Sequence, residues 1–213
     1  MSRIKEVGWP VAPITDRAST FGWVRWEALA EKNDLRPVFG VELAVCESLG
    51  EKKPTVDYWT FLAIDDVAAI NLLVELATQQ FRYTPLLTYE QANEARGVVK
   101  ICGHRAKLEL VEPDFYTYYG VGPATARGHL RRARERGLGL VATTDNYFPR
   151  RDDDGFYEVL CGRGASTQTY DQHIQSDDEW RASVARLRLT DEQLDNALKV
   201  RNAAWEVSQA ELK

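Results

Sequence analysis

Short apolar runs alternate with amphipathic segments along most of the 213-residue chain. We interpret the runs as strands, and the segments that repeat apolar residues at three- and four-residue steps as helices. This alternation predicts an α/β fold in which helices cover a parallel sheet or barrel. The predicted strands are Val11–Thr15, Val38–Cys46, Val56–Ala63, Val98–Cys102, Phe115–Tyr119 and the apolar run that follows Gly137.

The helical segments are marked by caps and breakers as well as by periodicity. Two of them begin with the spacing of a capping box, Ser176 to Glu179 and Thr190 to Gln193. The predicted helices are Arg3–Gly8, Phe21–Asn33, a segment after Asp65-Asp66, Thr88–Arg96, Pro123–Arg136, a segment after Asp152-Asp153-Asp154, and two C-terminal helices, the second running from about Asp191 towards Leu212.

Within Phe21–Asn33 the aliphatic positions Val24, Ala28 and Leu29 form one stripe, which we expect to face the core. Trp23 and Trp26 cannot both share that face. One of the two tryptophans would then be exposed for a partner.

Three of the apolar runs lead into an acidic residue, at Asp16, Glu42 and Asp145. The carboxyl ends of parallel strands meet at one rim, so three carboxylates could gather there as a metal site requires. The alternative is that each acid caps the helix that follows it.

Composition narrows the class of protein. A net charge of -5 argues against non-specific nucleic-acid binding by the whole surface, although it leaves room for a local basic patch. No run approaches the roughly 20 apolar residues of a membrane span, and the N-terminus lacks the apolar core of a signal peptide. We therefore expect a cytoplasmic protein without a membrane partner. Cys46, Cys102 and Cys161 fit reduced core thiols.

The order of these pieces resembles the PHP (polymerase and histidinol phosphatase) domain, in the version at the N-terminus of the bacterial DNA polymerase III alpha subunit. The resemblance implies a distorted (β/α)7-like barrel over residues 1–170 and a C-terminal helical extension over residues 171–213, packed on the barrel or projecting from it. The matching motifs are Ile14-Thr15-Asp16, Phe21-Gly22, Leu35-Arg36-Pro37-Val38-Phe39-Gly40-Val41-Glu42, Phe61-Leu62-Ala63 with Asn71-Leu72, Leu140-Val141-Ala142-Thr143-Thr144-Asp145, Ile174-Gln175-Ser176 with Glu179, and Asn196-Ala197.

Catalytic members of the family hold metal ions that activate water against a phosphate ester. The family's opening His-x-His pair is expected before the first helix, and this chain begins inside that helix, so we expect both ligands to be missing. Arg17, Tyr58 and Tyr147 stand where the resemblance places histidine ligands. The vestigial metal candidates are Asp16, Glu42, His104 and Asp145.

We therefore expect no catalytic residues and no cofactor, or at most one weakly bound divalent metal. Arg17 is expected to pair with Asp16, Glu42 or Asp145, because a fixed guanidinium can neutralise a carboxylate that a metal would otherwise neutralise. For His104 a structural role is the alternative, and His129 and His173 are expected to face water.

Two surfaces are candidates for binding a partner. One is the basic helix with Arg131, Arg132, Arg134 and Arg136, which would suit DNA or an acidic partner unless it is an ordinary solvated face. The other is a C-terminal stripe that includes Trp205, which is either left uncovered for a partner or packed on the protein's own barrel.

The first functional hypothesis is a free-standing, catalytically degenerate PHP-domain protein, of a kind that a phage could encode. By resemblance it would be a protein-binding or scaffold module in DNA replication, with a replication protein or a polymerase or exonuclease component as its partner. The alternative is a metal-dependent phosphoesterase or 3'-5' exonuclease with a reduced metal site.

Overall fold

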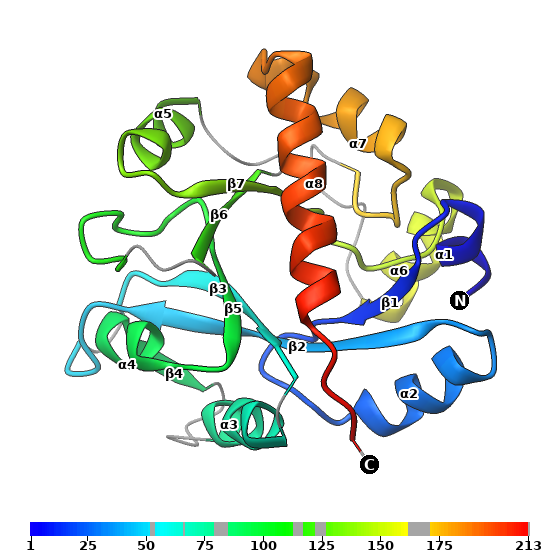
Figure 1. Ribbon diagram of the computed structural model, residues 1–213, viewed down its shortest axis with the longest axis horizontal. Coiled ribbons are helices and arrows are strands. Elements are labelled where there is room, and N and C mark those ends of the chain that lie inside the picture. The colour runs from blue at the N-terminus through cyan, green and yellow to red at the C-terminus, as the bar shows by residue number, and fades with distance from the viewer. Residues whose placement is uncertain are drawn as a thin grey trace.

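The computed structural model describes residues 1–51, 54–65, 67–78, 85–112, 117–121, 127–161 and 171–212. A curled seven-stranded sheet forms its centre, with helices arranged around it (Figure 1). The strands are β1 (Val11–Ile14), β2 (Arg36–Cys46), β3 (Asp57–Ala63), β4 (Leu86–Thr88), β5 (Val98–Cys102), β6 (Thr117–Val121) and β7 (Gly139–Ala142). The helices are α1 (Ser2–Glu6), α2 (Trp23–Glu31), α3 (Val67–Thr78), α4 (Tyr89–Glu94), α5 (Arg127–Glu135), α6 (Asp154–Cys161), α7 (Asp177–Ser183) and α8 (Asp191–Val207), with 3-10 turns η1 (Arg151–Asp153) and η2 (Ala185–Leu187).

The α/β class is confirmed, but the sheet is not wholly parallel. Its order is β1-β2-β3-β5-β6-β7, with β4 beside β2, and β3 runs antiparallel to both of its neighbours. A parallel pair needs a crossover of about a dozen residues or more, usually a helix. Among the described residues no helix lies between β2 and β3, so these two strands pair directly as a hairpin.

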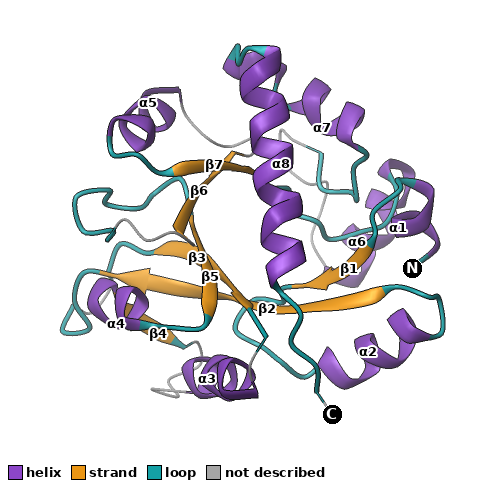
Figure 2. Cartoon of the chain, in the orientation of Figure 1, coloured by secondary structure: helices purple, strands orange, loops and turns teal. Residues whose placement is uncertain are grey.

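The sheet curls into a half-barrel whose two outer strands are β1 and β7. In Figures 1 and 2, α8 runs across the space between these strands, and α2, α3, α4 and α5 lie outside the sheet. Pro13 is tolerated inside β1 because this strand is at an edge, where its missing N–H removes no ladder hydrogen bond on the open side.

Each face of the sheet buries its own hydrophobic core. The outer core joins strand residues such as Val41 and Phe61 to the surrounding helices, for example through Leu73 of α3. The inner core joins Val38 and Leu62 to residues of α1, of α8 and of the segment after α1. These residues are Ile4, Trp9, Ala204 and Trp205. Helix α8 therefore supplies the inner face with the apolar cover that further strands would provide in a closed barrel.

Residues from the N-terminal part of the chain hold α8 and the segment before α7 in place. The ring centroids of Trp9 and Trp205 are 5.1 Å apart. Arg36 donates a 2.7 Å hydrogen bond to the carbonyl of Trp205. Arg3 donates to the carbonyl of Ile174 at 3.1 Å. The C-terminal helices consequently pack on the half-barrel.

Helix α2 buries a different face from the one predicted. Val24 is 73% exposed and Leu29 is 38% exposed, whereas Trp23 is 3% exposed and Trp26 is partly buried. The prediction that the aliphatic stripe faces the core is wrong. Trp23, Trp26 and Ala30 follow helical steps of three and four, and two indoles offer far more apolar area than the aliphatic residues.

The histidine prediction is also wrong, because His129 and His173 are buried. His129 lies on the face of α5 that packs towards β6, with its ring centroid 4.5 Å from that of Tyr119. Burial, with help from the charges of Arg132 and His104, lowers the pKa of His129 to about 4, so the ring is neutral at pH 7. The polar residues beside each histidine in the sequence conceal this burial.

Other local predictions agree with the structure. Both capping boxes are present, at the starts of α7 and α8, and Cys46 and Cys102 are buried thiols. Parts of some predicted elements lie outside the described residues, namely Asp66, Phe115-Tyr116 and residues 123–126, as does the side chain of Cys161. No described helix combines the length and apolar character needed to cross a membrane.

Candidate functional site: the cavity between β1 and β7

An open cavity of about 730 Å³ lies inside the half-barrel. Its walls come from the end of β1, one side of α2, the middle of β2, the loop after β7, and α8. The cavity lies where α8 crosses between the outer strands β1 and β7. It remains open because the side chains of a crossing helix fill such a gap less completely than further strands would. Two of the acids that the sequence singled out lie just after a strand end, whereas Glu42 lies inside β2 instead of ending a strand.

The structure brings the three predicted acids to one cavity. Asp16 follows β1, Glu42 lies in the middle of β2, and Asp145 follows β7. Burial raises the pKa of both Asp16 and Glu42, and the charge of Asp145 raises that of Glu42 further. Glu42 and Asp145 are therefore close enough to repel each other, whereas the guanidinium of Arg17 acts in the opposite direction on the pKa of Glu42.

Backbone pairing fixes Glu42 beside the turn that carries Asp16. The N–H of Glu42 donates to the carbonyl of Asp16 at 3.1 Å, and the N–H of Ala18 donates to the carbonyl of Glu42 at 2.8 Å. Strand β1 has already ended here, so these two bonds continue its pairing with β2 for one more step. The intervening Arg17 is thereby held next to Glu42.

Arg17 forms an ion pair with Glu42, as expected from the sequence. Its Nε lies 2.5 Å from Oε1 of Glu42. Its guanidinium carbon lies 4.1 Å from the ring centroid of Tyr58, a cation–π arrangement. Tyr147 lines the same cavity and acts electrostatically on Arg17. Tyr58 and Tyr147 thus both lie near the guanidinium of Arg17.

His104 is placed apart from this group. It follows β5, is exposed, and is absent from the cavity lining. Asp57 holds the turn around it by accepting hydrogen bonds from the backbone N–H groups of Gly103 and Arg105, at 2.9 and 3.0 Å. Within the described ranges, no three His, Cys, Asp or Glu side chains are grouped so that they could hold a metal ion.

Sequence reasoning placed Arg201 in the C-terminal stripe without giving it a role, and it did not single out Asp57. Arg201 of α8 lines the cavity, is 9% exposed, pairs with Asp177 at 2.9 Å and lies 4.5 Å above the ring of Trp205. Its place in the apolar stripe of α8 was the available signal. Asp57 is also buried, which raises its pKa to about 6 against the pull of its backbone hydrogen bonds. No pattern around Asp57 marks it.

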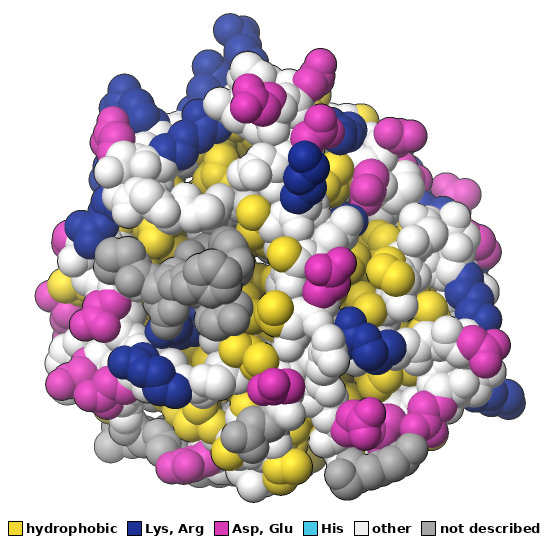
Figure 3. Space-filling model, in the orientation of Figure 1, with side chains coloured by type: hydrophobic (Ala, Val, Ile, Leu, Met, Phe, Trp, Pro, Cys, Tyr) yellow, Lys and Arg dark blue, Asp and Glu magenta, His cyan; other side chains and the backbone are white. Residues whose placement is uncertain are grey.

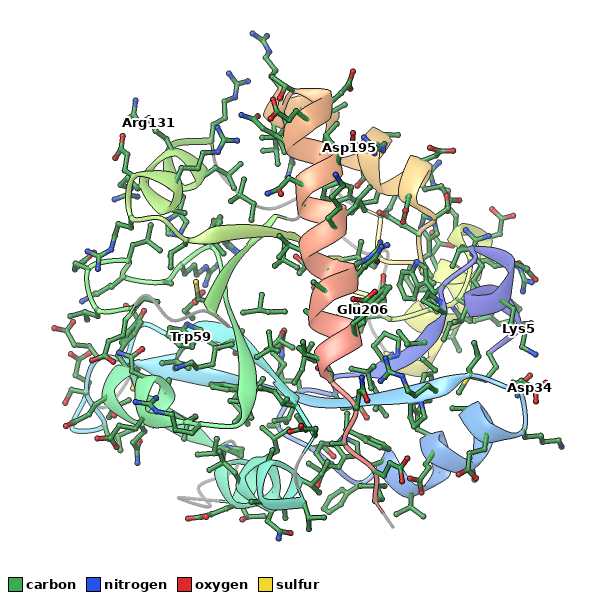
Figure 4. All side chains as sticks on the ribbon, in the orientation of Figure 1. Lys5, Asp34, Trp59, Arg131, Asp195 and Glu206 are labelled. Atoms are coloured by element: carbon green, nitrogen blue, oxygen red, sulfur yellow. The ribbon has the colours of Figure 1, made fainter. Side chains whose placement is uncertain are left out.

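The two partner-binding candidates are placed differently. Trp205 is 7% exposed and packs against Trp9, so the stripe of α8 covers this protein's own inner core. The arginines of α5 are exposed, and Figure 4 shows Arg131 projecting outward from that helix. The described residues thus provide an exposed basic surface and an acid-lined cavity that Arg17 and Arg201 also line.

No protein-family model matches the chain, and no curated protein shows significant similarity to it.

Proposed function

We propose that this chain is a catalytically degenerate PHP-like protein that acts as a protein-binding or scaffold module in DNA replication. The partner would be a replication protein, or a polymerase or exonuclease component. The observation that carries the proposal is the 2.5 Å ion pair between Arg17 and Glu42. The carboxylate of Glu42 is engaged by Arg17. By the resemblance, Arg17 stands at a position where hydrolytic members of the family would have a metal ligand.

The surroundings of this ion pair support the proposal. A guanidinium beside Glu42 repels an incoming divalent cation, and Tyr58 stacked on Arg17 keeps it in place. Asp16 and Asp145 alone offer fewer ligands than two-metal hydrolysis requires. A fold that keeps the rim of such a site without its metal chemistry is suited to work as a scaffold.

The test measures binding and hydrolysis with the same protein. Purified host replicative polymerase and proofreading exonuclease are titrated against the wild-type chain and against Asp145→Asn. We expect binding of one of them, unchanged by the substitution, because the rim acids would have no part in a binding surface. Failure of both to bind, in a sample shown to be folded by circular dichroism, would reject the proposal.

The alternative is a metal-dependent phosphoesterase or exonuclease, favoured by the convergence of Asp16, Glu42 and Asp145 on one cavity. Wild-type protein is incubated with Mn²⁺ and a phosphodiester substrate, and its metal content is measured after purification without chelator. Metal-dependent hydrolysis that disappears in Asp145→Asn, or two or more equivalents of bound metal, would establish the enzyme. Hydrolysis that persists in Asp145→Asn would indicate a contaminating nuclease.

A further inference from the structure

A second hollow, distinct from the cavity, lies between α5 and the segment after η2. This groove, of about 360 Å³, is lined by four arginines: Arg127, Arg131, Arg134 and Arg188. Its apolar floor comes from Leu130, Leu187 and Leu189. We call it the arginine groove. Arg127 also donates a 3.2 Å hydrogen bond to the carbonyl of Arg186, which ties α5 to the opposite wall.

The spacing of arginines on α5 explains which of them face the groove. Arg127, Arg131 and Arg134 follow one another at steps of four and three residues, so they share one side of the helix. Arg132 and Arg136 instead line a separate hollow, where Glu109 and Glu135 are among their neighbours. The sequence grouped the arginines of this helix as one patch, whereas the structure divides them between two surfaces.

The positive charge of the groove is left largely uncompensated. No acidic side chain lines it in the described part of the chain. Arg131 lies 3.8 Å from Glu135, but both side chains are well exposed, at 78% and 64%, and a pair of this kind is weak. Arg134 and Arg188 form no ion pair with any described residue. By contrast, Arg17 and Arg201 each have a close carboxylate.

Arg188 occupies a backbone position that favours glycine or asparagine. Its φ of 52° and ψ of 45° lie in the left-handed region. That region costs a residue with a Cβ about 1 kcal/mol or more. Arg188 is less stable in this conformation than glycine would be, and its side chain lines the groove opposite α5. Outliers of this kind are found preferentially at functional sites.

The lining also indicates the ligand. Guanidinium groups bind phosphate oxygens in a forked geometry, and several in a row match the repeated charges of a nucleic-acid backbone. Binding of single strands depends on aromatic side chains that stack with bases. No aromatic residue lines the groove among the described residues. Figure 3 shows Lys and Arg side chains gathered around α5 and the nearby end of α8, at the upper left and top of that view.

We propose that the arginine groove binds the phosphate backbone of duplex DNA, without base readout. This inference does not depend on the proposed function, because it concerns a different surface and a different partner. It adds a direct DNA contact to a protein whose overall charge is negative. Contacts to phosphate position a protein on DNA without selecting sequence.

The experiment measures binding of the full chain to a fluorescein-labelled DNA duplex by anisotropy, over a series of salt concentrations. Four phosphate contacts predict a slope of about -3 to -4 for log K against log salt concentration. The double variant Arg134→Glu, Arg188→Glu should weaken binding at least about tenfold and reduce the slope by about 2. Both side chains are exposed, so the fold should be unaffected.

Arg188→Gly separates binding from stability. Glycine adopts the left-handed conformation without strain, so the melting temperature should stay the same or rise. The slope of log K against log salt concentration should nevertheless become less steep by about 1. The double variant Lys5→Glu, Lys32→Glu lowers the net charge by the same amount as the double groove variant, at exposed positions in α1 and just after α2. As the matched control, it should bind DNA much as the wild type does.

Three outcomes would overturn the inference. One is duplex binding that the double groove variant and the Lys5→Glu, Lys32→Glu control change equally, which would indicate a general charge effect. Another is binding of the same-length single strand more tightly than the duplex. The last is tighter binding of poly-glutamate than of DNA, which would identify an acidic protein segment as the ligand.

Discussion

In the middle of the sheet each strand pairs with neighbouring strands, whereas at the opening between β1 and β7 the helix α8 covers the inner face. The hairpin β2–β3 and its neighbour β5 pair over long registers, and Trp59 and Phe61 on β3 are fully buried. At the opening, Trp205 of α8 covers the inner face and leaves a cavity of about 730 Å³. Backbone pairing fills the space between strands completely, but side chains of a crossing helix do not.

The two regions also treat polar groups differently. In the middle, Asp57 is buried and saturated by backbone N–H groups. At the opening, three carboxylates face a common space, and a partly exposed arginine pairs with one of them. The contrast indicates that the middle of the sheet contributes more to the stability of the fold, and that the charged side chains available to a ligand lie at the opening.

The strongest test compares a tryptophan from each region. Trp59→Ala should destabilise the fold by about 4–5 kcal/mol, because its site is enclosed and can relax little. Trp205→Ala should cost less, about 3 kcal/mol, since its neighbours border an existing cavity. Urea unfolding of both variants measures the difference. A Trp205→Ala protein as stable as the wild type would show that α8 does not hold the opening.

A second test concerns Asp57 and pH. Burial raises its pKa from 3.8 to about 6, so between these values the folded protein keeps a proton that the unfolded chain has released. The stability due to Asp57 is therefore greatest at low pH and falls as pH rises through this window, by roughly 2–3 kcal/mol. The Asp57→Asn variant should lack this pH-dependent part of the unfolding free energy.

Unfolding curves of wild type and Asp57→Asn at intervals from pH 4 to pH 7 provide the measurement. The difference between their unfolding free energies should change across the window and be constant above it. Parallel pH profiles would mean that Asp57 titrates normally and that the middle of the sheet is more open to water than its contacts indicate.

The smallest expected effect belongs to the opening. Arg17 and Glu42 are 46% and 22% exposed, so their coupling should be about 1 kcal/mol or less. A double-mutant cycle of Arg17→Met and Glu42→Gln isolates this coupling from the loss of each side chain. A coupling above about 3 kcal/mol would be typical of a buried pair and would remove the distinction between the two regions.

Much of the local structure was predictable because the signals are local. The capping boxes at Ser176 and Thr190, and the strand that ends at Cys102, follow from a few adjacent residues. The convergence of Asp16 and Asp145 on one cavity followed from the common direction of their strands.

The remaining features depend on competition between distant groups, which a pattern does not record. The buried face of α2 was decided by Trp23 packing on Phe39, with ring centroids 5.3 Å apart. The reversed direction of β3 was decided by hairpin pairing with β2. The burial of His129 depends on its stacking against Tyr119 from another element. In each case the sequence offered two arrangements, and tertiary contacts selected one.

The position of α8 has a consequence for the order in which the protein folds. The hairpin β2–β3 joins residues near in sequence, so its loop closes quickly and at low entropic cost. Trp9 and Trp205 meet only after almost the whole chain has been bridged. During synthesis the half-barrel would therefore expose its inner face until α8 emerges from the ribosome. During that interval the exposed apolar surface makes the chain most prone to aggregation.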